Sequence, residues 1–284
     1  MCPSMKETIK FPSIVEDMPD ADYRLVDALN WSSLKHLNDC PAKFFLERRD
    51  PKPPTEAMKF GTAYHCYALE RKIFRSRYKV IPKMVRRGKE WDLVCQEAAL
   101  ENRQLVFEHE RDLMGSMAKV FDAHTFVNGM MGNSRREVCV FWRHRGIKCK
   151  GKVDILNEKL RLIADLKTTT DCKPDKFMPE ILKRGYDQQM AFYIDGLASN
   201  RIYVDSFVIF AQSTERPYGV WAYEGKREEI DAARVELDKL FKLYEACNEA
   251  NYWPLYPEVL TRIQIPKFIK EKREKGESYY AESD

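Results

Sequence analysis

Hydrophobic and polar residues alternate most regularly in the middle of the chain, where the pattern predicts β-strands. From Ile147 to Leu156, hydrophobic or small residues at every second position alternate with three lysines and Asp154. Successive side chains of a strand point to opposite faces, so one face is expected to be buried and the other charged. The same pattern predicts neighbouring strands over 137–142 and 160–167, with a hairpin turn at 157–159.

The period of the pattern then changes to that of helices. Residues 174–184 and 186–199 predict two helices separated by Gly185, and strands are expected over 203–211 and 218–223. A long amphipathic helix is expected over 226–251, because its hydrophobic residues recur every three or four positions. This order of strands and helices predicts an α/β core over residues 133–260.

The first half of the chain has the composition of helices. Two short helices are expected over 30–50 and another over 60–70, and residues 85–128 are expected to be helical with a break near Gly115. These segments form the helical part, 28–132, of a single domain over 28–260. Residues 1–27 contain three prolines and are expected to be irregular, and the charged tail, 261–284, is expected to be mobile.

Composition narrows the possible classes of protein. The 284 residues are 44% hydrophobic and 32% charged, as in a globular domain with a real core, and the net charge of +4 does not by itself indicate nucleic acid. The sequence contains neither a membrane-spanning apolar run nor a signal-peptide core, which favours a cytoplasmic protein. Its eight cysteines form no CxxC pair, so neither a zinc ribbon nor an iron–sulfur cluster is predicted.

Three charged residues in the predicted hairpin are candidates for catalysis. Asp165 and Lys167 are two positions apart in a strand and so share a face, and the hairpin would bring Asp154 beside them. Adjacent carboxylates repel unless a cation lies between them, and Mg²⁺ prefers such oxygen ligands. Lys167 would then orient a water or stabilise charge on a phosphate. An isolated Asp-x-Lys is more often a solvated strand edge or an ion pair.

Four stretches in the same order resemble one known family. They are LKHLNDCPAKFF at 34–45, GTAYHCYALE at 61–70, GKVDIL together with IADLKTT in the predicted hairpin, and QMAFY at 189–193. The sequence resembles the exonuclease VIII (RecE-like) branch of the PD-(D/E)XK nucleases, which is related more distantly to lambda exonuclease and the RecB nuclease domain. The resemblance implies a restriction-endonuclease-like core, in which helices flank a central mixed sheet.

The resemblance also implies roles for individual residues. Metal ligands would be His65, Asp154, Asp165 and the backbone carbonyl of Leu166, with Mg²⁺ as cofactor and Mn²⁺ as a substitute, and Lys167 would be catalytic. Gln189 and Tyr193, one helical turn apart, would face the active site and the DNA. Without the resemblance, a single helical histidine is more often structural, and ordinary helix packing remains an alternative for the Gln–Tyr pair.

The same resemblance implies a substrate and partners. The expected activity is digestion of one strand from the ends of duplex DNA, 5′ to 3′, which leaves single strands for recombination by an annealing protein. Family members form rings, so a homo-oligomer is expected. Basic residues near the hairpin would contact DNA phosphates, namely Lys148, Lys150, Lys152, Arg143 and Arg145. A solvated charged strand is the alternative for each of them.

Three other functions are compatible with parts of the pattern. A structure-specific endonuclease or a CRISPR-associated trimming nuclease would use the same fold, and a DNA-binding protein without catalysis would keep only the fold. Such an inactive relative would be expected to lose Asp154, Asp165 or Lys167, and all three are present. A metabolic metalloenzyme is disfavoured, because the sequence has no HExxH-type motif.

Overall fold

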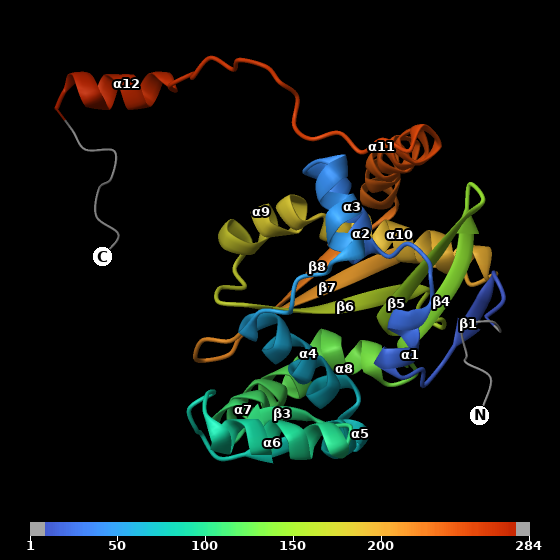
Figure 1. The fold of residues 1–284 in the computed structure, drawn as a ribbon, viewed down its shortest axis with the longest axis vertical. Helices are drawn as coiled ribbons and strands as arrows, with labels where there is room; N and C mark the ends of the chain where they lie inside the picture. Colours follow the sequence, from blue (N-terminus) through green and yellow to red (C-terminus); the bar gives the residue numbers. More distant parts are fainter. Residues whose placement is uncertain (1–8, 277–284) are drawn as a thin grey trace.

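A six-stranded mixed sheet forms the centre of this computed structural model, which describes residues 9–276 (Figure 1). Its strands, in spatial order, are β1 (Ser13–Val15), β4 (Arg135–His144), β5 (Ile147–Asn157), β6 (Leu162–Thr169), β7 (Ser206–Ser213) and β8 (Val220–Gly225). Within this sheet, only β6 and β7 are parallel neighbours, and α9 (Pro174–Arg184) and α10 (Tyr186–Ser199) connect them. A parallel pair needs such a crossover, which here places helices against the sheet.

Two tight hairpins set the register of the three central strands. Arg145 and Gly146 form the turn between β4 and β5, both with positive φ, and His144 pairs with Ile147. Between β5 and β6, the side chain of Asn157 accepts a hydrogen bond from the Leu160 amide at 3.0 Å. The turn extends to Arg161, so β6 begins two residues later than the sequence pattern predicts.

Hydrophobic layers cover both faces of the sheet. On one face, α10 and α11 (Arg227–Ala250) pack on strand side chains such as Trp142, together with α2 (Trp31–Leu34), the 3₁₀ helix η2 (Lys35–Asn38) and α3 (Pro41–Arg49). On the other face, α4 (Glu56–Leu69) and α7 (Glu108–Ala123) pack on Leu166 and Phe210. This arrangement confirms the predicted α/β class, with helices flanking a mixed sheet.

The helical half differs from the prediction between residues 100 and 115. The elements of the helical half that have not yet been named are α5 (Arg71–Arg77), β2 (Tyr78–Ile81), α6 (Lys89–Leu100), β3 (Gln104–Phe107) and α8 (Thr125–Met131). The helical stretch is interrupted by β3, which pairs in parallel with β2, and the predicted break near Gly115 is wrong. Gly115 lies inside α7, where a Cβ atom would stand 3.4 Å from the Tyr67 hydroxyl of α4. The glycine therefore permits close helix packing.

Both ends of the described chain contain regular structure. The prediction of an irregular N-terminal segment is wrong for residues 13–25, which form β1 and then α1 (Asp20–Leu25), whereas residues 1–8 lie outside the described residues. In the predicted tail, α12 (Lys267–Glu274) follows an extended segment and lies apart from the sheet (Figure 1). The tail beyond residue 276 lies outside the described residues. Among the helices of residues 9–276, none is long and apolar enough to span a membrane.

Candidate active site

Asp154 and Asp165 meet where β5 separates from β6. Ile155 pairs with Ala164, so the hairpin register places Asp154 opposite Asp165. At this point the ladder ends, and Asp154 Oδ2 accepts a hydrogen bond from the Leu166 amide at 2.9 Å. The side chain thus takes the place of a backbone acceptor, which fixes the carboxylate against β6. The predicted juxtaposition of these two residues is present in the structure.

Asp165 is held directly by Lys167 and Gln189, and Gln189 in turn contacts Tyr193. Asp165 Oδ2 lies 2.6 Å from Lys167 Nζ, and its Oδ1 accepts a hydrogen bond from Gln189 Nε2 at 3.1 Å. The same amide group donates to the Tyr193 hydroxyl at 3.0 Å. Because Asp165 is only 2% exposed, these contacts set its orientation. Gln189 and Tyr193 therefore reach the site, as their spacing on one helical face predicts.

His65 reaches the site from the opposite direction, on α4. That helix begins after Thr55, whose hydroxyl accepts from the Met58 amide at 3.3 Å, and packs against the sheet. His65 Nδ1 lies 3.3 Å from Asp154 Oδ2. The structure thus brings together residues 89 positions apart in the sequence, as the resemblance implies. The role of the buried Leu166 as a ligand through its carbonyl stays a prediction.

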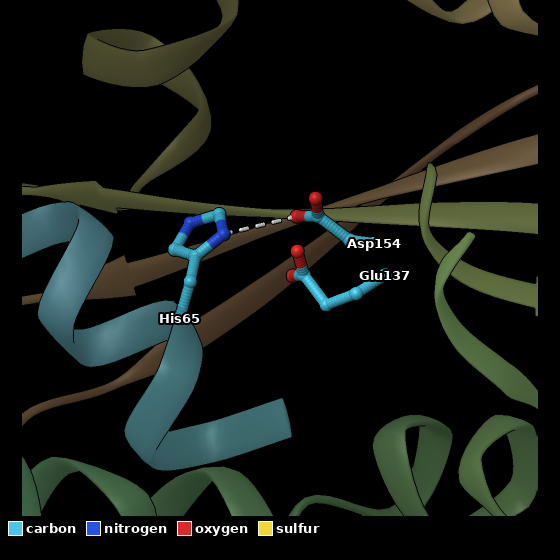
Figure 2. A group of neighbouring side chains, drawn as sticks. All are labelled: His65, Glu137 and Asp154. Atoms are coloured by element: carbon cyan, nitrogen blue, oxygen red, sulfur yellow. Dashed lines mark ion pairs between the residues drawn. The ribbon is translucent and has the colours of Figure 1, made fainter. Parts of the chain in front are cut away.

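Glu137 is a member of the site that the sequence analysis did not identify. Ligand atoms of His65, Glu137 and Asp154 all lie within 4.8 Å of one another, and Figure 2 shows the three side chains converging. The register signal for Glu137 is present in the sequence, because the two-residue turn that pairs His144 with Ile147 also aligns position 137 with position 154. Residue type alone does not distinguish Glu137 from other charged strand residues, whereas the strand register does.

Burial shapes the electrostatics of these carboxylates. It raises the pKa of Asp165 to about 6, with Lys167 opposing the shift and Asp154 adding to it. Burial and the neighbouring charge of Asp154 raise the pKa of Glu137 to about 8. For Lys167, burial alone would lower the pKa, but Asp165 and Asp154 hold it well above its ordinary value. Carboxylates crowded in this way are stabilised by a divalent cation, so the donor set fits a metal ion.

Gly151, the glycine of the GKVD stretch, lies against the Tyr193 ring and so affects the site indirectly. A Cβ atom on Gly151 would lie 2.7 Å from two ring carbons of Tyr193, which is closer than real side chains allow. Tyr193 in turn accepts the hydrogen bond of Gln189, which orients Asp165. Gly151 therefore allows the Tyr193 ring to approach β5 closely, and the G-x-x-D and Q-x-x-x-Y stretches pack directly against each other.

We expect Gly151→Ala to lower the free energy of unfolding by about 2 kcal/mol, because the buried ring must move. The shift should also loosen Asp165 and reduce nuclease activity. Urea unfolding and a DNA digestion assay measure the two effects. Gly129→Ala in α8 is the matched control, since a Cβ atom there meets nothing within 4 Å. Equal behaviour of the two variants would contradict this account of Gly151.

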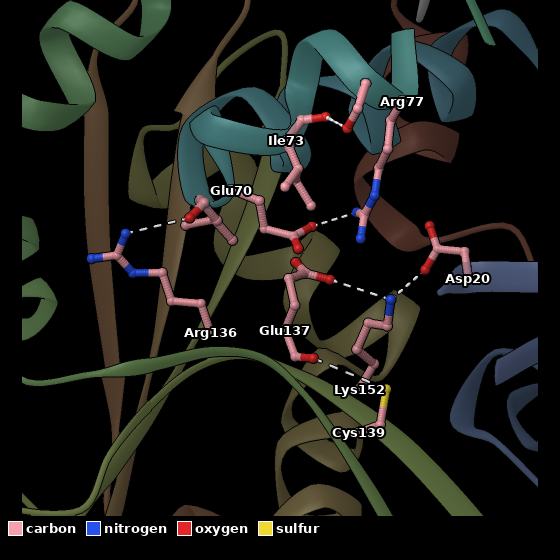
Figure 3. Close-up of polar contacts among 10 residues, drawn as sticks. Asp20, Glu70, Ile73, Arg77, Arg136, Glu137, Cys139 and Lys152 are labelled. Atoms are coloured by element: carbon pink, nitrogen blue, oxygen red, sulfur yellow. Dashed lines mark hydrogen bonds and ion pairs between the residues drawn. The ribbon is translucent and has the colours of Figure 1, made fainter. Parts of the chain in front are cut away.

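Lys150 and Lys152 have a different role from the predicted contact with DNA. Lys150 is 5% exposed and donates to the carbonyls of Tyr23 and Val26 at 2.8 and 2.7 Å. Lys152 forms ion pairs with Asp20 of α1 and, at 3.6 Å, with Glu137 (Figure 3). The N-terminal segment covers this strand face, so both ammonium groups are directed to partners inside the protein.

The other three predicted DNA contacts, Arg143, Arg145 and Lys148, lie at the turn between β4 and β5. Lys148 is exposed and lies over the Phe11 ring, and Arg143 donates to the Gly146 carbonyl at 2.8 Å. Arg145 forms ion pairs with α11, at 2.9 Å to Glu245. Lys148 and Asp154 are six positions apart along β5, which is about 20 Å. Their contact with DNA stays a prediction.

Comparison with known proteins agrees with the fold and the site. The family model of the PDDEXK-like domain of unknown function (DUF3799) matches residues 30–263. The chain belongs to this family. A PDDEXK-like domain is what the exonuclease VIII resemblance predicts at the level of the superfamily, and the match includes every residue of the site described above. None of the curated proteins matches the chain.

Two solved structures resemble this PDDEXK-like chain. One is a "Putative exonuclease" from Eubacterium rectale, with 14% sequence identity and a TM-score of 0.62, covering 90% of this chain and 98% of its own. The other is a phage-related exonuclease from Haemophilus somnus 129PT, with 13% identity and a TM-score of 0.37, covering 78% of this chain and 96% of its own. The first likeness supports the fold alone, because the identity is low.

Proposed function

We propose that this PDDEXK-like protein is a divalent-metal-dependent exodeoxyribonuclease that digests duplex DNA from its ends. One observation carries the proposal: Asp154, Asp165 and Lys167 converge at the point where β5 leaves β6, with Lys167 Nζ 2.6 Å from Asp165. A pair of carboxylates beside a lysine is suited to phosphodiester hydrolysis, in which negative charge develops on the phosphate. The family match adds that residues 30–263 form a PDDEXK-like domain.

The residues of the site are suited to bind a divalent ion, and each has a separate proposed role. His65, Asp154, Asp165 and the Leu166 carbonyl would hold Mg²⁺, with Mn²⁺ as a substitute, and the bound ion supplies Lewis-acid chemistry toward the phosphate. Lys167 keeps its proton beside Asp165, so its ammonium can donate to a phosphate oxygen or hold the attacking water. Gln189 orients Asp165.

The preference for DNA ends rests on the motifs that resemble exonuclease VIII. By that resemblance we propose 5′ to 3′ digestion, which leaves a single strand for an annealing protein, and a ring-shaped homo-oligomer acting in the cytoplasm. The Eubacterium rectale protein is named a "Putative exonuclease", which supports only the exonuclease part of this proposal. A structure-specific endonuclease or a CRISPR-associated trimming nuclease would use the same residues and differ in which DNA it accepts.

We expect linear duplex DNA to be digested and covalently closed circular duplex to remain intact. The assay uses both substrates at equal concentration with Mg²⁺ or Mn²⁺, and with EDTA as the metal-free control. Activity should disappear with EDTA, and Ca²⁺ should support binding without turnover, because it is a poorer Lewis acid in this geometry. Linear DNA labelled at its 5′ or 3′ end reports polarity by which label is released first.

The results of this digestion assay distinguish the exonuclease from an endonuclease and from a DNA-binding protein without catalysis. Cutting of closed circular DNA at a comparable rate would replace the exonuclease by an endonuclease. Full activity in EDTA would contradict metal dependence. Binding of linear DNA without hydrolysis under any metal would favour a DNA-binding protein that has kept the fold.

A further inference from the structure

Glu137 joins the site through an unusual backbone conformation. It lies within β4 between two regular pairs, Arg136 with Ile155 and Val138 with Val153, and its φ is +51°. Residues other than glycine rarely adopt a positive φ, and those that do are concentrated at functional sites. The irregularity lies opposite Asp154, where the β5 ladder to β6 also ends. Two strands thus depart from regular pairing at the point where His65 approaches.

The polar surroundings of Glu137 do not satisfy its carboxylate. Its side chain is 14% exposed, and its Oε1 is buried without a hydrogen-bond partner. Its ion pair within the described part of the chain is with Lys152, at 3.6 Å, and that lysine also pairs with Asp20 (Figure 3). Buried polar atoms are nearly always paired, so a carboxylate oxygen that has no hydrogen-bond partner and lies beside a second carboxylate is suited to bind a cation.

Asp165 does not belong to the same group of ligand atoms. Its two oxygens are directed to Lys167 and to Gln189, at 2.6 and 3.1 Å. The convergent atoms belong to His65, Glu137 and Asp154, which come from α4, β4 and β5 (Figure 2). Asp154 therefore stands between two sets of donors, one toward Asp165 and one toward Glu137.

We propose that Glu137 is a metal ligand, and that His65, Glu137 and Asp154 hold a divalent ion at a position separate from the one between Asp154 and Asp165. His65 then belongs to this ion, while Asp154, Asp165 and the Leu166 carbonyl hold the other. This inference rests on the proposed metal dependence and deepens it. One imidazole and two carboxylates suit Mn²⁺ better than Mg²⁺, because nitrogen is a poorer donor to the harder ion. Asp154 would contact both ions.

Direct counting of bound Mn²⁺ tests the proposal without any DNA. Isothermal titration, with electron paramagnetic resonance of free Mn²⁺ as a second readout, should give two ions per wild-type chain. Glu137→Gln keeps the size of the side chain and removes its charge, and should bind one ion. Asp165→Asn should also bind one ion, and the double variant Glu137→Gln/Asp165→Asn none. Circular dichroism melting reports that each variant is folded.

The test includes a matched control variant, Glu158→Gln, and a second variant of the proposed site, His65→Gln. Glu158→Gln changes an exposed glutamate in the turn after β5, paired with Arg135, and should still bind two ions. His65→Gln should lose the same ion as Glu137→Gln, so it serves if the latter does not fold. Each should weaken binding at that position by at least about tenfold, the effect of removing even an outer partner of a metal ligand.

The possible results are distinct for the two proposals. Two ions of unchanged affinity in Glu137→Gln, or a single ion in the wild type, would overturn the role of Glu137 while metal-dependent digestion of DNA could stand. The proposed nuclease function fails separately, if the wild type digests no DNA with Mg²⁺ or Mn²⁺. Loss of one ion in Glu137→Gln and in His65→Gln, with two retained in Glu158→Gln, supports the inference.

Discussion

Replacing Asp154 with asparagine is expected to reduce DNA hydrolysis by about three orders of magnitude, equivalent to ~4 kcal/mol of transition-state stabilisation. Asparagine has the same shape and can still accept the hydrogen bond of the Leu166 amide, so the hairpin should persist. What it removes is the charge that faces His65 at 3.3 Å and Asp165 across the strand gap. A divalent ion would then lose its shared ligand.

The measurement is kcat/KM on linear duplex DNA at saturating Mg²⁺, with thermal melting of each variant. In metal-free buffer the variant should be at least as stable as the wild type, because the repulsion between buried carboxylates is relieved. Asp205→Asn is the control, since that aspartate is exposed and pairs with Arg161. Activity above a tenth of wild type in a folded Asp154→Asn protein would remove Asp154 from the active site.

The central hairpin could be predicted from sequence because its information is local. Alternation between Ile147 and Leu156 specifies a strand, and the spacing from Asp154 to Asp165 fits a tight turn. The helix positions of Gln189 and Tyr193 follow from a spacing of four. Within such a segment, each residue's place depends on neighbours a few positions away, and the predicted boundaries agree with the structure to within a few residues.

The misassigned parts depend on contacts between distant segments. The strands β1 and β3 are short, and each exists because a partner far along the chain pairs with it. The charged face of β5 was predicted correctly as charged, but the pattern could not show that α1 covers it. Lys150 and Lys152 therefore serve the docking of α1. Glu137 was missed because its role depends on the register of two hairpins counted together.

Replacing Lys167 with methionine should also reduce DNA hydrolysis by about three orders of magnitude, because it removes the proposed donor to the phosphate or the attacking water. Unlike the loss of Asp154, this change should destabilise the protein. Asp165 is 2% exposed, and its pairing with Lys167 at 2.6 Å is its only ion pair within the described residues. Removing one member of a buried ion pair costs about 3–5 kcal/mol, because the other charge stays buried.

The loss of stability should depend on pH in a defined direction. Burial already raises the pKa of Asp165 to about 6 in the folded wild type, and without Lys167 the folded pKa should rise further. A carboxyl whose folded pKa is raised contributes stability at pH below its unfolded value, and that contribution is lost as the pH rises through the folded pKa. The difference between wild type and Lys167→Met should therefore be small below about pH 6, where Asp165 is protonated in both folded proteins, and should grow as the pH rises above that value.

Urea unfolding in EDTA at pH 4.5, 6 and 8 measures this difference directly. Lys173→Met is the control, because Lys173 is exposed and pairs with the partly exposed Asp171, so its effect should stay below about 1 kcal/mol at every pH. Lys167→Arg keeps the charge beside Asp165 and should recover most of the stability while activity stays low, since the guanidinium differs in shape and donor geometry. A pH-independent loss in Lys167→Met would mean that the lysine stabilises the fold through its packing on Tyr186, 4.7 Å away, rather than through the charge of Asp165.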